Sequence, residues 1–261
     1  MNKDKKSLLI FYAITLAVSL VFEILYIVYP ENPLWVALLM WVPGAVGIVC
    51  AKAFYPEEKL TKIFKKINPV YVILAILIPL VYLVASYLIA WGALGDPANG
   101  NPTVNFALFV PVLLGSILTA AGEELGWRGF AYPVLKRACG PVWAVLINGF
   151  VWGIWHLPMI LGGVYQAQVS PVYGVISFLI EIMLIAVVLC WLRGASGSVL
   201  PAILLHAVHN MVDQAYLQPM STNATTPYFA GEQGMITIAI CALIAAGIVI
   251  WNRKGKPAQK S

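Results

Sequence analysis

The chain has 261 residues, of which 61% are hydrophobic and only 10% are charged, and its formal net charge is +5. A soluble globular domain carries about 45–50% apolar and about 25% charged residues, so this chain has too little charge to cover a surface in water. The composition therefore excludes a soluble enzyme, a disordered chain and a nucleic-acid-binding protein, and it predicts an integral membrane protein.

Eight segments are apolar over a length that crosses a bilayer, which takes about 20 residues of helix. In chain order they are approximately residues 7–30, 34–54, 69–92, 104–127, 141–161, 171–192, 197–217 and 234–251. We expect the fourth helix to continue to about Lys136, because only Pro133 interrupts it. The sequence thus predicts an all-α fold, a single polytopic membrane domain over residues 1–261 with about eight transmembrane helices.

The basic residues separate cleanly along this set of spans. All 16 Lys and Arg residues lie at the termini or in the connections after the second, fourth and sixth spans, and the other connections contain none. Lys and Arg concentrate on the cytoplasmic side of membrane proteins. We therefore expect a multi-pass protein, located in the cell membrane if the source is prokaryotic, with both termini in the cytoplasm.

Residues 57–67, between the second and third spans, have the pattern of an amphipathic helix. Leu60, Ile63, Phe64 and Ile67 recur at helical spacing, and lysines occupy the opposite face. Such a helix lies in the membrane interface against anionic headgroups. The segment therefore predicts an interfacial helix, with a solvated charged loop as the alternative.

Few ionisable side chains lie within the spans, where each is costly unless it is paired or faces a polar cavity. They are Glu23, Glu123, Glu124, Glu181, Asp213 and all three histidines of the chain, His156, His206 and His209. Glu123, His156 and His206 each lie ~20–24 Å along their helices from the nearest cytoplasmic anchor. A carboxylate and two imidazoles at one depth predict a shared polar site. Glu23 and Glu181 are expected to pack in the core or to lie at a cavity edge.

Position around the fourth helix separates the roles of its two carboxylates. Glu123 and Glu124 are consecutive and therefore point ~100° apart. Arg128 follows Glu124 at i+4, the spacing of an ion pair on one helix face. We therefore expect Glu124 and Arg128 to form a structural pair, which leaves Glu123 to face the site.

The fifth and seventh spans add further members. His206 and Asn210 share one face of the seventh span at i, i+4 spacing, and Asp213 continues the same stripe. Asp213 either orients a histidine or lies near the outer interface. His209 is offset by ~60° and either borders the cavity or lies behind it. Trp152, one turn before the histidine of the fifth span, is expected to form an aromatic wall.

A buried carboxylate beside an imidazole can activate water to hydrolyse an acyl bond, most simply a peptide bond. A second imidazole and an amide can donate hydrogen bonds to the oxyanion of the tetrahedral intermediate. In a second scheme, Glu123, His156 and His206 are instead the three ligands of a catalytic Zn²⁺ or another divalent metal ion. Both schemes predict an intramembrane endopeptidase.

Three motifs support this interpretation: Glu123-Glu124-x-x-x-Arg128, Trp152-x-x-x-His156 and His206-x-x-x-Asn210. In this order, each on a separate span, they resemble the motifs of the CPBP family, which includes CAAX prenyl endopeptidases, bacteriocin-processing proteins and Abi-type membrane proteases. The resemblance covers residues 104–217, the expected catalytic helices. One departure is Trp152, where the family usually has Phe.

The resemblance implies a role for each motif residue. Glu123 would be the catalytic base, and His156 would help it to activate the water. His206 and Asn210 would stabilise the oxyanion. The substrate would be a peptide or protein, lipidated or bound in the bilayer. Glu124 and Arg128 would hold the site together. Apart from the resemblance, their helix positions make Trp152, His209 and Asp213 further supporting residues.

A non-catalytic immunity or scaffolding protein of the membrane, with the same fold, is the alternative function. A broken motif would favour it, whereas every motif residue is intact here. A transporter or proton relay is less well supported, because transporters usually contain repeated halves and none is visible in this sequence.

Overall fold

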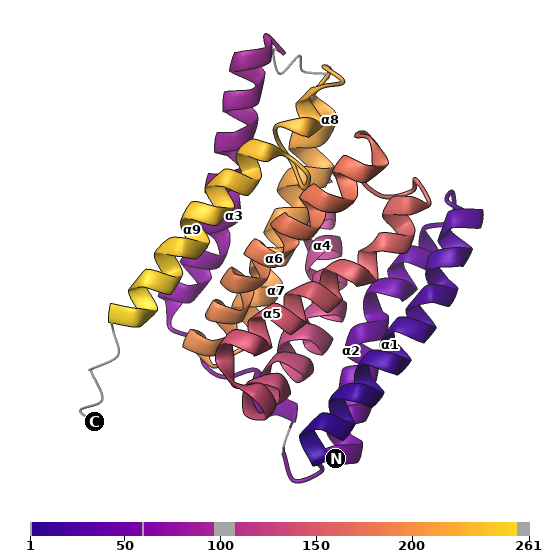
Figure 1. Ribbon diagram of the computed structural model, residues 1–261, viewed down its shortest axis with the longest axis vertical. Helices are drawn as coiled ribbons and strands as arrows, with labels where there is room; N and C mark the ends of the chain where they lie inside the picture. Colours follow the sequence, from indigo (N-terminus) through magenta and orange to yellow (C-terminus); the bar gives the residue numbers. More distant parts are fainter. Residues whose placement is uncertain (1, 59, 97–107, 255–261) are drawn as a thin grey trace.

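The computed structural model describes residues 2–58, 60–96 and 108–254, and every regular element within these ranges is a helix (Figure 1). The elements are α1 (Lys3–Val28), α2 (Pro33–Phe54), the 3₁₀ helix η1 (Leu60–Ile63), α3 (Pro69–Leu94), α4 (Phe109–Glu124), the π-helix η3 (Leu125–Ala131), α5 (Tyr132–Leu161), α6 (Pro171–Ser196), α7 (Leu200–Asn210), the π-helix η4 (Met211–Leu217), α8 (Gln218–Met220), the 3₁₀ helix η5 (Thr226–Tyr228) and α9 (Met235–Lys254). The predicted all-α polytopic bundle is confirmed.

Among the described residues, 6 helices are long and apolar enough to cross a membrane. They are Lys3–Val28, Pro33–Phe54, Pro69–Leu94, Phe109–Leu161, Pro171–Ser196 and Met235–Arg253. The protein is therefore an integral membrane protein. The sequence predicted eight spans. The count here is lower because the predicted fourth and fifth spans fall within one stretch, Phe109–Leu161, and the seventh is divided among the shorter α7, η4 and α8. The number of crossings stays a prediction.

Gly140 divides the long helix Phe109–Leu161 into two parts. Its φ of 82° and ψ of 169° are not helical, and glycine tolerates such a backbone because it has no Cβ. Pro141 begins the second part, where its missing N–H would have no helical partner. The predicted continuation of the fourth helix to about Lys136 is confirmed, whereas residues 104–107 of that span lie outside the described residues.

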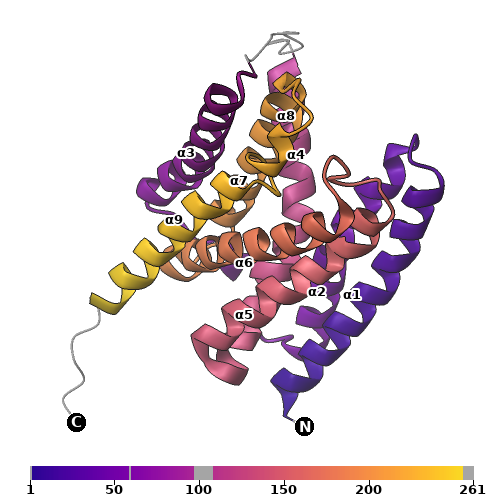
Figure 2. The same cartoon turned by 45° about the horizontal axis from the view of Figure 1, so that its top comes forward.

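Four helices form the centre of the bundle. α5 packs against α6, and α4 packs against α7. On one side, α1 and α2 pack together and contact α5 and α4; on the other, α3 and α9 contact α7 and α6 (Figures 1 and 2). The helices that carry the predicted site residues are therefore enclosed by the others.

The close approach of α2 to α4 and η3 depends on glycine. A Cβ added at Gly122 would lie 2.6 Å from the carbonyl oxygen of Met40, and one at Gly126 would lie 2.3 Å from that of Pro43. No side chain fits at these distances, and small residues are what allow helix backbones to approach closely in membranes. The contact fixes the helix that carries Glu123 against α2.

The connection between α2 and α3 does not form the predicted interfacial helix over residues 57–67. Lys59 lies outside the described residues, and the rest of the segment contains only the short 3₁₀ helix η1. Ile63 packs against the cluster that contains Val199 and Ile203, and its carbonyl oxygen accepts a hydrogen bond from Val199 N at 2.8 Å. Docking onto the start of α7 thus replaces the helical hydrogen bonds that the apolar spacing predicted.

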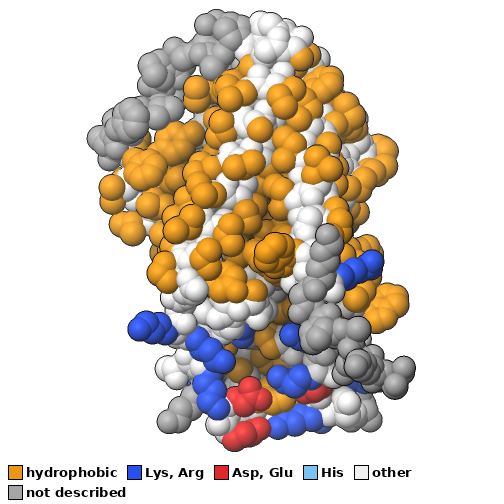
Figure 3. Space-filling view, turned by 90° about the vertical axis from the view of Figure 1, so that its left-hand side faces the viewer, with side chains coloured by type: hydrophobic (Ala, Val, Ile, Leu, Met, Phe, Trp, Pro, Cys, Tyr) orange, Lys and Arg blue, Asp and Glu red, His pale blue; other side chains and the backbone are white. Residues whose placement is uncertain are grey.

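Charged side chains gather at one end of the molecule. Figure 3 shows Lys and Arg side chains there, next to a broad band of hydrophobic side chains. α1 begins at this end, and α9 runs toward it (Figure 1). The separation of basic residues expected from the sequence is therefore present in space, while the side of the membrane on which this end lies stays a prediction.

Candidate active site

A cavity of about 490 Å³ lies between α2, α4, α5 and α7. Its lining includes Glu123 of α4, His156 of α5, and His206 and Asn210 of α7. The structure therefore brings the four residues expected to be catalytic, which come from three distant parts of the chain, to the edge of one space inside the bundle.

Glu123 is held by one of its two carboxylate oxygens. Its side chain is buried, and Oε2 accepts a hydrogen bond from Trp152 Nε1 at 2.8 Å. The Arg128 guanidinium lies 4.0 Å from the centroid of the Trp152 ring, at a distance typical of a cation–π contact. Trp152 is thus more than the expected aromatic wall, because its N–H orients Glu123. Among the described residues, Oε1 of Glu123 has no protein hydrogen-bond partner.

The ring of His156 is oriented by its own helix. Nδ1 lies 2.9 Å from the carbonyl oxygen of Trp152, and a carbonyl can only accept, so Nδ1 carries a proton. In the neutral ring Nε2 is then an acceptor. The ring is also packed between Trp155 and Phe178 at centroid distances of 4.7 and 5.1 Å. His156 is therefore ready to accept a hydrogen bond from water in the cavity.

Glu124 forms the ion pair that its spacing to Arg128 predicts. Oε1 accepts a hydrogen bond from Arg128 Nη1 at 2.8 Å, and both side chains are fully buried. The same oxygen lies 3.0 Å from Nδ1 of His206, which must be the donor if the carboxylate is ionised. Glu124 therefore connects Arg128 to His206 and orients the ring of His206.

Both π-helices begin immediately after residues of the site. η3 follows Glu124, and η4 follows Asn210. The wider turns of η3 leave backbone groups for neighbouring helices: Asn148 Nδ2 donates to the carbonyl oxygen of Trp127 at 3.0 Å, and Arg193 Nε donates to that of Arg128 at 3.0 Å. Such bulges are frequent at functional sites, and here they tie α4 to α5 and α6.

Comparison with known proteins agrees with this geometry. A family model described as type II CAAX prenyl endopeptidase Rce1-like matches residues 105–212, which include Glu123, His156, His206 and Asn210. Over these residues the chain is similar to the CPBP family, which includes the CAAX prenyl endopeptidases. The resemblance expected from the three motifs is confirmed.

A curated relative is also a CAAX prenyl protease. The chain is 28% identical over 151 residues to a CAAX prenyl protease 2 of Methanococcus maripaludis, and the alignment covers 56% of this chain and 51% of that protein. The chain thus spans about half the length of this relative. The CPBP motifs lie in the four central helices, and the flanking α1 and α9 lie outside the family match.

His209 and Asp213 do not line the cavity of about 490 Å³. They lie behind it, together with Glu232 from the loop before α9. The expected stripe from His206 through Asn210 to Asp213 ends at Asn210, because the wider turn of η4 changes the direction in which later side chains point. His209 borders a second, smaller cavity of about 30 Å³, which His206, Asn210 and Glu232 also line.

Three further polar residues belong to the surroundings of the site but were not predicted. Tyr165 and Gln214 also line the catalytic cavity, and both donate hydrogen bonds to Glu232. Burial acts to raise the pKa of Glu232, but hydrogen bonds from His209, Tyr165 and Gln214 outweigh it and lower the pKa. Tyr165 and Glu232 lie in connections between helices, so no spacing along a span could indicate them.

The predicted metal ligands were tested against the geometry. Among the described residues, one group of His, Cys, Asp or Glu side chains brings three ligand atoms within 4.8 Å of one another, and it is His209, Asp213 and Glu232. As placed, Glu123, His156 and His206 are not such a group, and they do not fit a three-ligand metal site. A metal at these three residues stays a prediction.

Proposed function

We propose that the protein is an intramembrane endopeptidase in which Glu123 and His156 activate water to hydrolyse a peptide bond. The observation that carries this proposal is the cavity of about 490 Å³, which Glu123, His156, His206 and Asn210 line together inside a membrane-spanning bundle. The match of residues 105–212 to the Rce1-like CAAX prenyl endopeptidase model and the similarity to a CAAX prenyl protease 2 support it.

In the first step a water molecule in the cavity is deprotonated as it attacks. Oε1 of Glu123 accepts a proton from the water, while Nε2 of His156 accepts a hydrogen bond from its other O–H. The water oxygen then bonds to the carbonyl carbon of the scissile peptide. Glu123 returns the proton to the leaving nitrogen as the C–N bond breaks, so that an acid and an amine leave. Positioned acid–base groups of this kind contribute about 10²–10⁴-fold to rate.

His206 and Asn210 stabilise the oxyanion that forms on the carbonyl oxygen. Asn210 donates from its side-chain amide, and His206 donates from Nε2 as an imidazolium whose Nδ1 is held by Glu124. Donors fixed before the reaction, in a site that excludes bulk water, stabilise developing charge without reorganising. Glu124 and Arg128 therefore act by positioning His206 rather than by contacting the substrate.

The walls of the cavity favour a substrate that reaches it from the bilayer. Several apolar side chains accompany the polar residues, among them Val36, Met40, Val112 and Met159. We infer that the substrate is a peptide or protein segment that is lipidated or membrane-bound, as the name of the relative from Methanococcus maripaludis also suggests.

The test compares the membrane proteomes of cells that express the wild-type protein or Glu123→Gln, with new chain ends mapped by mass spectrometry. Chain ends that need Glu123 would support the proposal. Glu23→Gln is the matched control, because Glu23 is a buried carboxylate of α1 outside the cavity lining, and it should give the wild-type pattern. Identical patterns from the wild type and Glu123→Gln, with equal protein levels, would favour the non-catalytic immunity or scaffolding function.

A further inference from the structure

A second polar group lies behind the catalytic cavity. His209 of α7, Asp213 of η4 and Glu232 of the loop before α9 each offer one ligand atom, and the three atoms lie within 4.8 Å of one another. Their exposed fractions are only 6%, 1% and 4%. The group therefore joins two consecutive helical segments to a distant loop at a point removed from solvent.

Each member of this group is held by a tyrosine through the atom that faces away from the other members. Tyr82 Oη lies 2.5 Å from Nδ1 of His209, and Tyr87 Oη donates to Oδ1 of Asp213 at 2.8 Å. Tyr165 Oη donates to Oε2 of Glu232. Residues that bind metals are commonly oriented by such outer hydrogen bonds, which also fix the tautomer of a ligating histidine.

The atoms that face the centre of the group have few hydrogen-bond partners. Nε2 of His209 lies 3.2 Å from Oε1 of Glu232, while Oδ2 of Asp213 is buried without a hydrogen-bond partner. Without a cation, Nε2–H of His209 donates to Glu232. To bind a cation, the ring must carry its proton on Nδ1, where it donates to Tyr82, so that Nε2 offers a lone pair. One nitrogen and two carboxylate oxygens thus converge.

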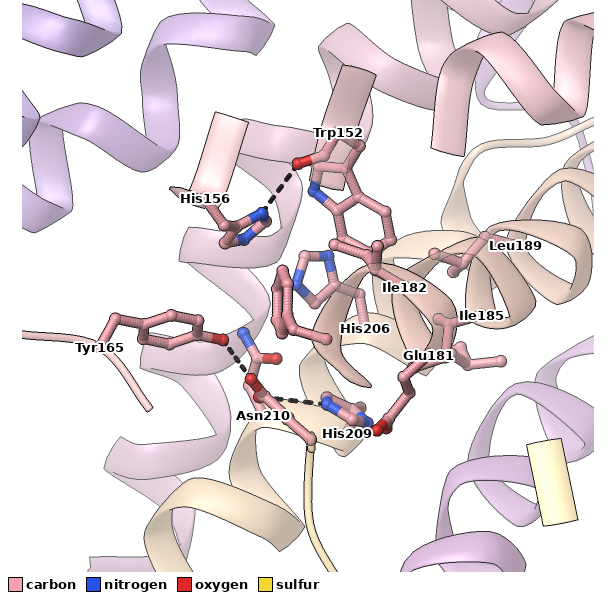
Figure 4. A pocket seen from close by; sticks show the side chains of 13 residues that line it. Trp152, His156, Tyr165, Glu181, Ile182, Ile185, Leu189, His206, His209 and Asn210 are labelled. Atoms are coloured by element: carbon pink, nitrogen blue, oxygen red, sulfur yellow. Dashed lines mark hydrogen bonds and ion pairs between the residues drawn. The ribbon is translucent and has the colours of Figure 1, made fainter. Parts of the chain in front are cut away.

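A third carboxylate adds negative charge to the same place. Glu181 is 1% exposed, and among the described residues neither of its oxygens has a hydrogen-bond partner. It lines a small cavity of about 30 Å³ with His209 and Glu232, and His206 and Asn210 also border this cavity. Figure 4 shows the Glu181 carboxylate directed toward the ring of His209. The described residues that line this cavity include neither Lys nor Arg. Ionised carboxylates that are buried without a partner are strongly unfavourable unless a proton or a cation neutralises them, so a bound cation would stabilise this group.

We propose that His209, Asp213 and Glu232 bind a divalent transition-metal ion such as Zn²⁺. Imidazole nitrogen and carboxylate oxygen are ordinary ligands of Zn²⁺, which takes four of them in tetrahedral sites. The fourth ligand is Glu181 or a water molecule, for which the cavity of about 30 Å³ has room. Bound Zn²⁺ replaces the proton on Nε2 of His209 and neutralises the carboxylates.

The ion acts as a structural link rather than as a catalyst. It connects the loop of Glu232 to η4 and α7, directly beside Asn210 of the catalytic cavity. Gly231 allows this loop to approach, because its φ of +86° is left-handed and a Cβ there would lie 2.8 Å from Tyr87 Oη. The site does not depend on the proposed protease function.

The test measures zinc binding to the purified full-length protein in detergent after treatment with a chelator. We expect one Zn²⁺ per chain by elemental analysis after zinc is added back. Ligand binding to the folded state raises the unfolding midpoint, and we expect a shift of about 5 °C or more with zinc in large excess over Kd. Asp213→Asn and Glu232→Gln should each lose the bound zinc and the shift, whereas the Glu23→Gln control should keep both.

X-ray absorption at the zinc edge provides a readout that does not depend on the stability of the variants. The proposed site contains one imidazole, whereas a metal at Glu123, His156 and His206 would have two. One imidazole and oxygen neighbours are the expected result. Two imidazoles, loss of zinc in Glu123→Gln but not in Asp213→Asn, or no zinc retained by the wild type would each overturn the proposal.

Discussion

Trp152 contacts two charged groups of the site, the Glu123 carboxylate and the Arg128 guanidinium. Its indole N–H donates to Glu123 at 2.8 Å, and its ring face lies 4.0 Å from the Arg128 guanidinium. The CPBP pattern usually has Phe here, which preserves the ring and removes the donor. In this protein the orientation of Glu123 therefore depends on a hydrogen bond that a phenyl ring cannot make.

Trp152→Phe should separate the role of the aromatic ring from that of the indole N–H donor. A hydrogen bond to a charged group is worth about 1.5–3 kcal/mol, and its loss frees Glu123 to rotate away from the water. We expect kcat to fall by about tenfold or more with KM unchanged, and the unfolding midpoint to fall as well, because the smaller ring leaves a cavity. Steady-state kinetics on the wild type and the variant would measure this, and an unchanged kcat would show that the indole N–H does not position Glu123.

At this scale, the sequence predicts contacts along one helix better than contacts between helices. The spacing of Glu124 and Arg128 correctly predicted their ion pair, because i, i+4 residues share a helix face. The bond from Glu124 to His206 joins residues far apart in the chain, and no spacing could reveal it. Glu232 lies in a loop expected to be outside the spans, so its burial beside His209 depends on the fold of the whole chain.

Among the elements, α4 and η3 are positioned by their contact with α2 through Gly126. A Cβ at Gly126 would lie 2.3 Å from the carbonyl oxygen of Pro43 and 2.4 Å from its carbonyl carbon. These are backbone atoms, so a side chain can be accommodated only if the two helices separate.

Gly126→Ala is therefore expected to lower the free energy of unfolding by about 1–3 kcal/mol, the usual cost of overpacking. Gly247→Ala on α9 is the matched control, since nothing lies within 4 Å of a Cβ there, and it should be neutral or slightly stabilising. Thermal unfolding in detergent compares the two. Equal midpoints for both variants would mean that α2 does not confine α4 as described.

The end of α3 is tied to the loop before α9 by Asp96. Its carboxylate accepts hydrogen bonds from Thr222 Oγ1 and Thr226 Oγ1, each at 2.7 Å, and from Asn223 N at 3.1 Å. Burial acts to raise the pKa of Asp96, but these hydrogen bonds outweigh it and leave the pKa below its ordinary value. The ionised form is therefore the one that stabilises the folded protein.

This direction of shift fixes the pH dependence. A carboxyl group with a lowered pKa contributes its stability above the unfolded value, about 3.9, and loses it as pH falls through the folded value. The wild type should therefore have a higher unfolding midpoint than Asp96→Asn at about pH 6, and the difference should shrink as pH falls to about 3. A difference that stays constant over this range would contradict the account of Asp96.

The lengths of the apolar segments predicted the long helices well. Where the prediction failed, local backbone conformation and hydrogen bonds are the reason. The helix past Lys136 followed from the absence of strong breakers, and Gly140 ends it through its own backbone conformation. The helix expected over residues 57–67 does not form, because Ile63 bonds to Val199 instead. The π-turns of η3 and η4 have no sequence signal that spacing reveals, since they depend on side chains of neighbouring helices.

At the scale of the whole molecule, basic residues that are separated along the sequence lie together in space. Basic side chains gather at the end where α1 begins and toward which α9 runs (Figures 1 and 3), as expected if positive charge stays in the cytoplasm. The cavity with Glu123 and His156 lies among the central helices, surrounded by α1, α2, α3 and α9. The equal depth of Glu123, His156 and His206 along their helices predicted a shared site. The volume and shape of the cavity depend instead on how the helices cross.

The most direct measurement of the central claim is the cleavage rate of the purified wild type and Glu123→Gln in lipid bilayers. The substrate is one whose new chain end appears only with the active protein. Glu123→Gln preserves size and the contact with Trp152 but cannot take a proton from water, so we expect a loss of about 10²–10⁴-fold. Glu23→Gln should cleave at the wild-type rate. A Glu123→Gln variant that cleaves as fast as the wild type would contradict water activation by Glu123.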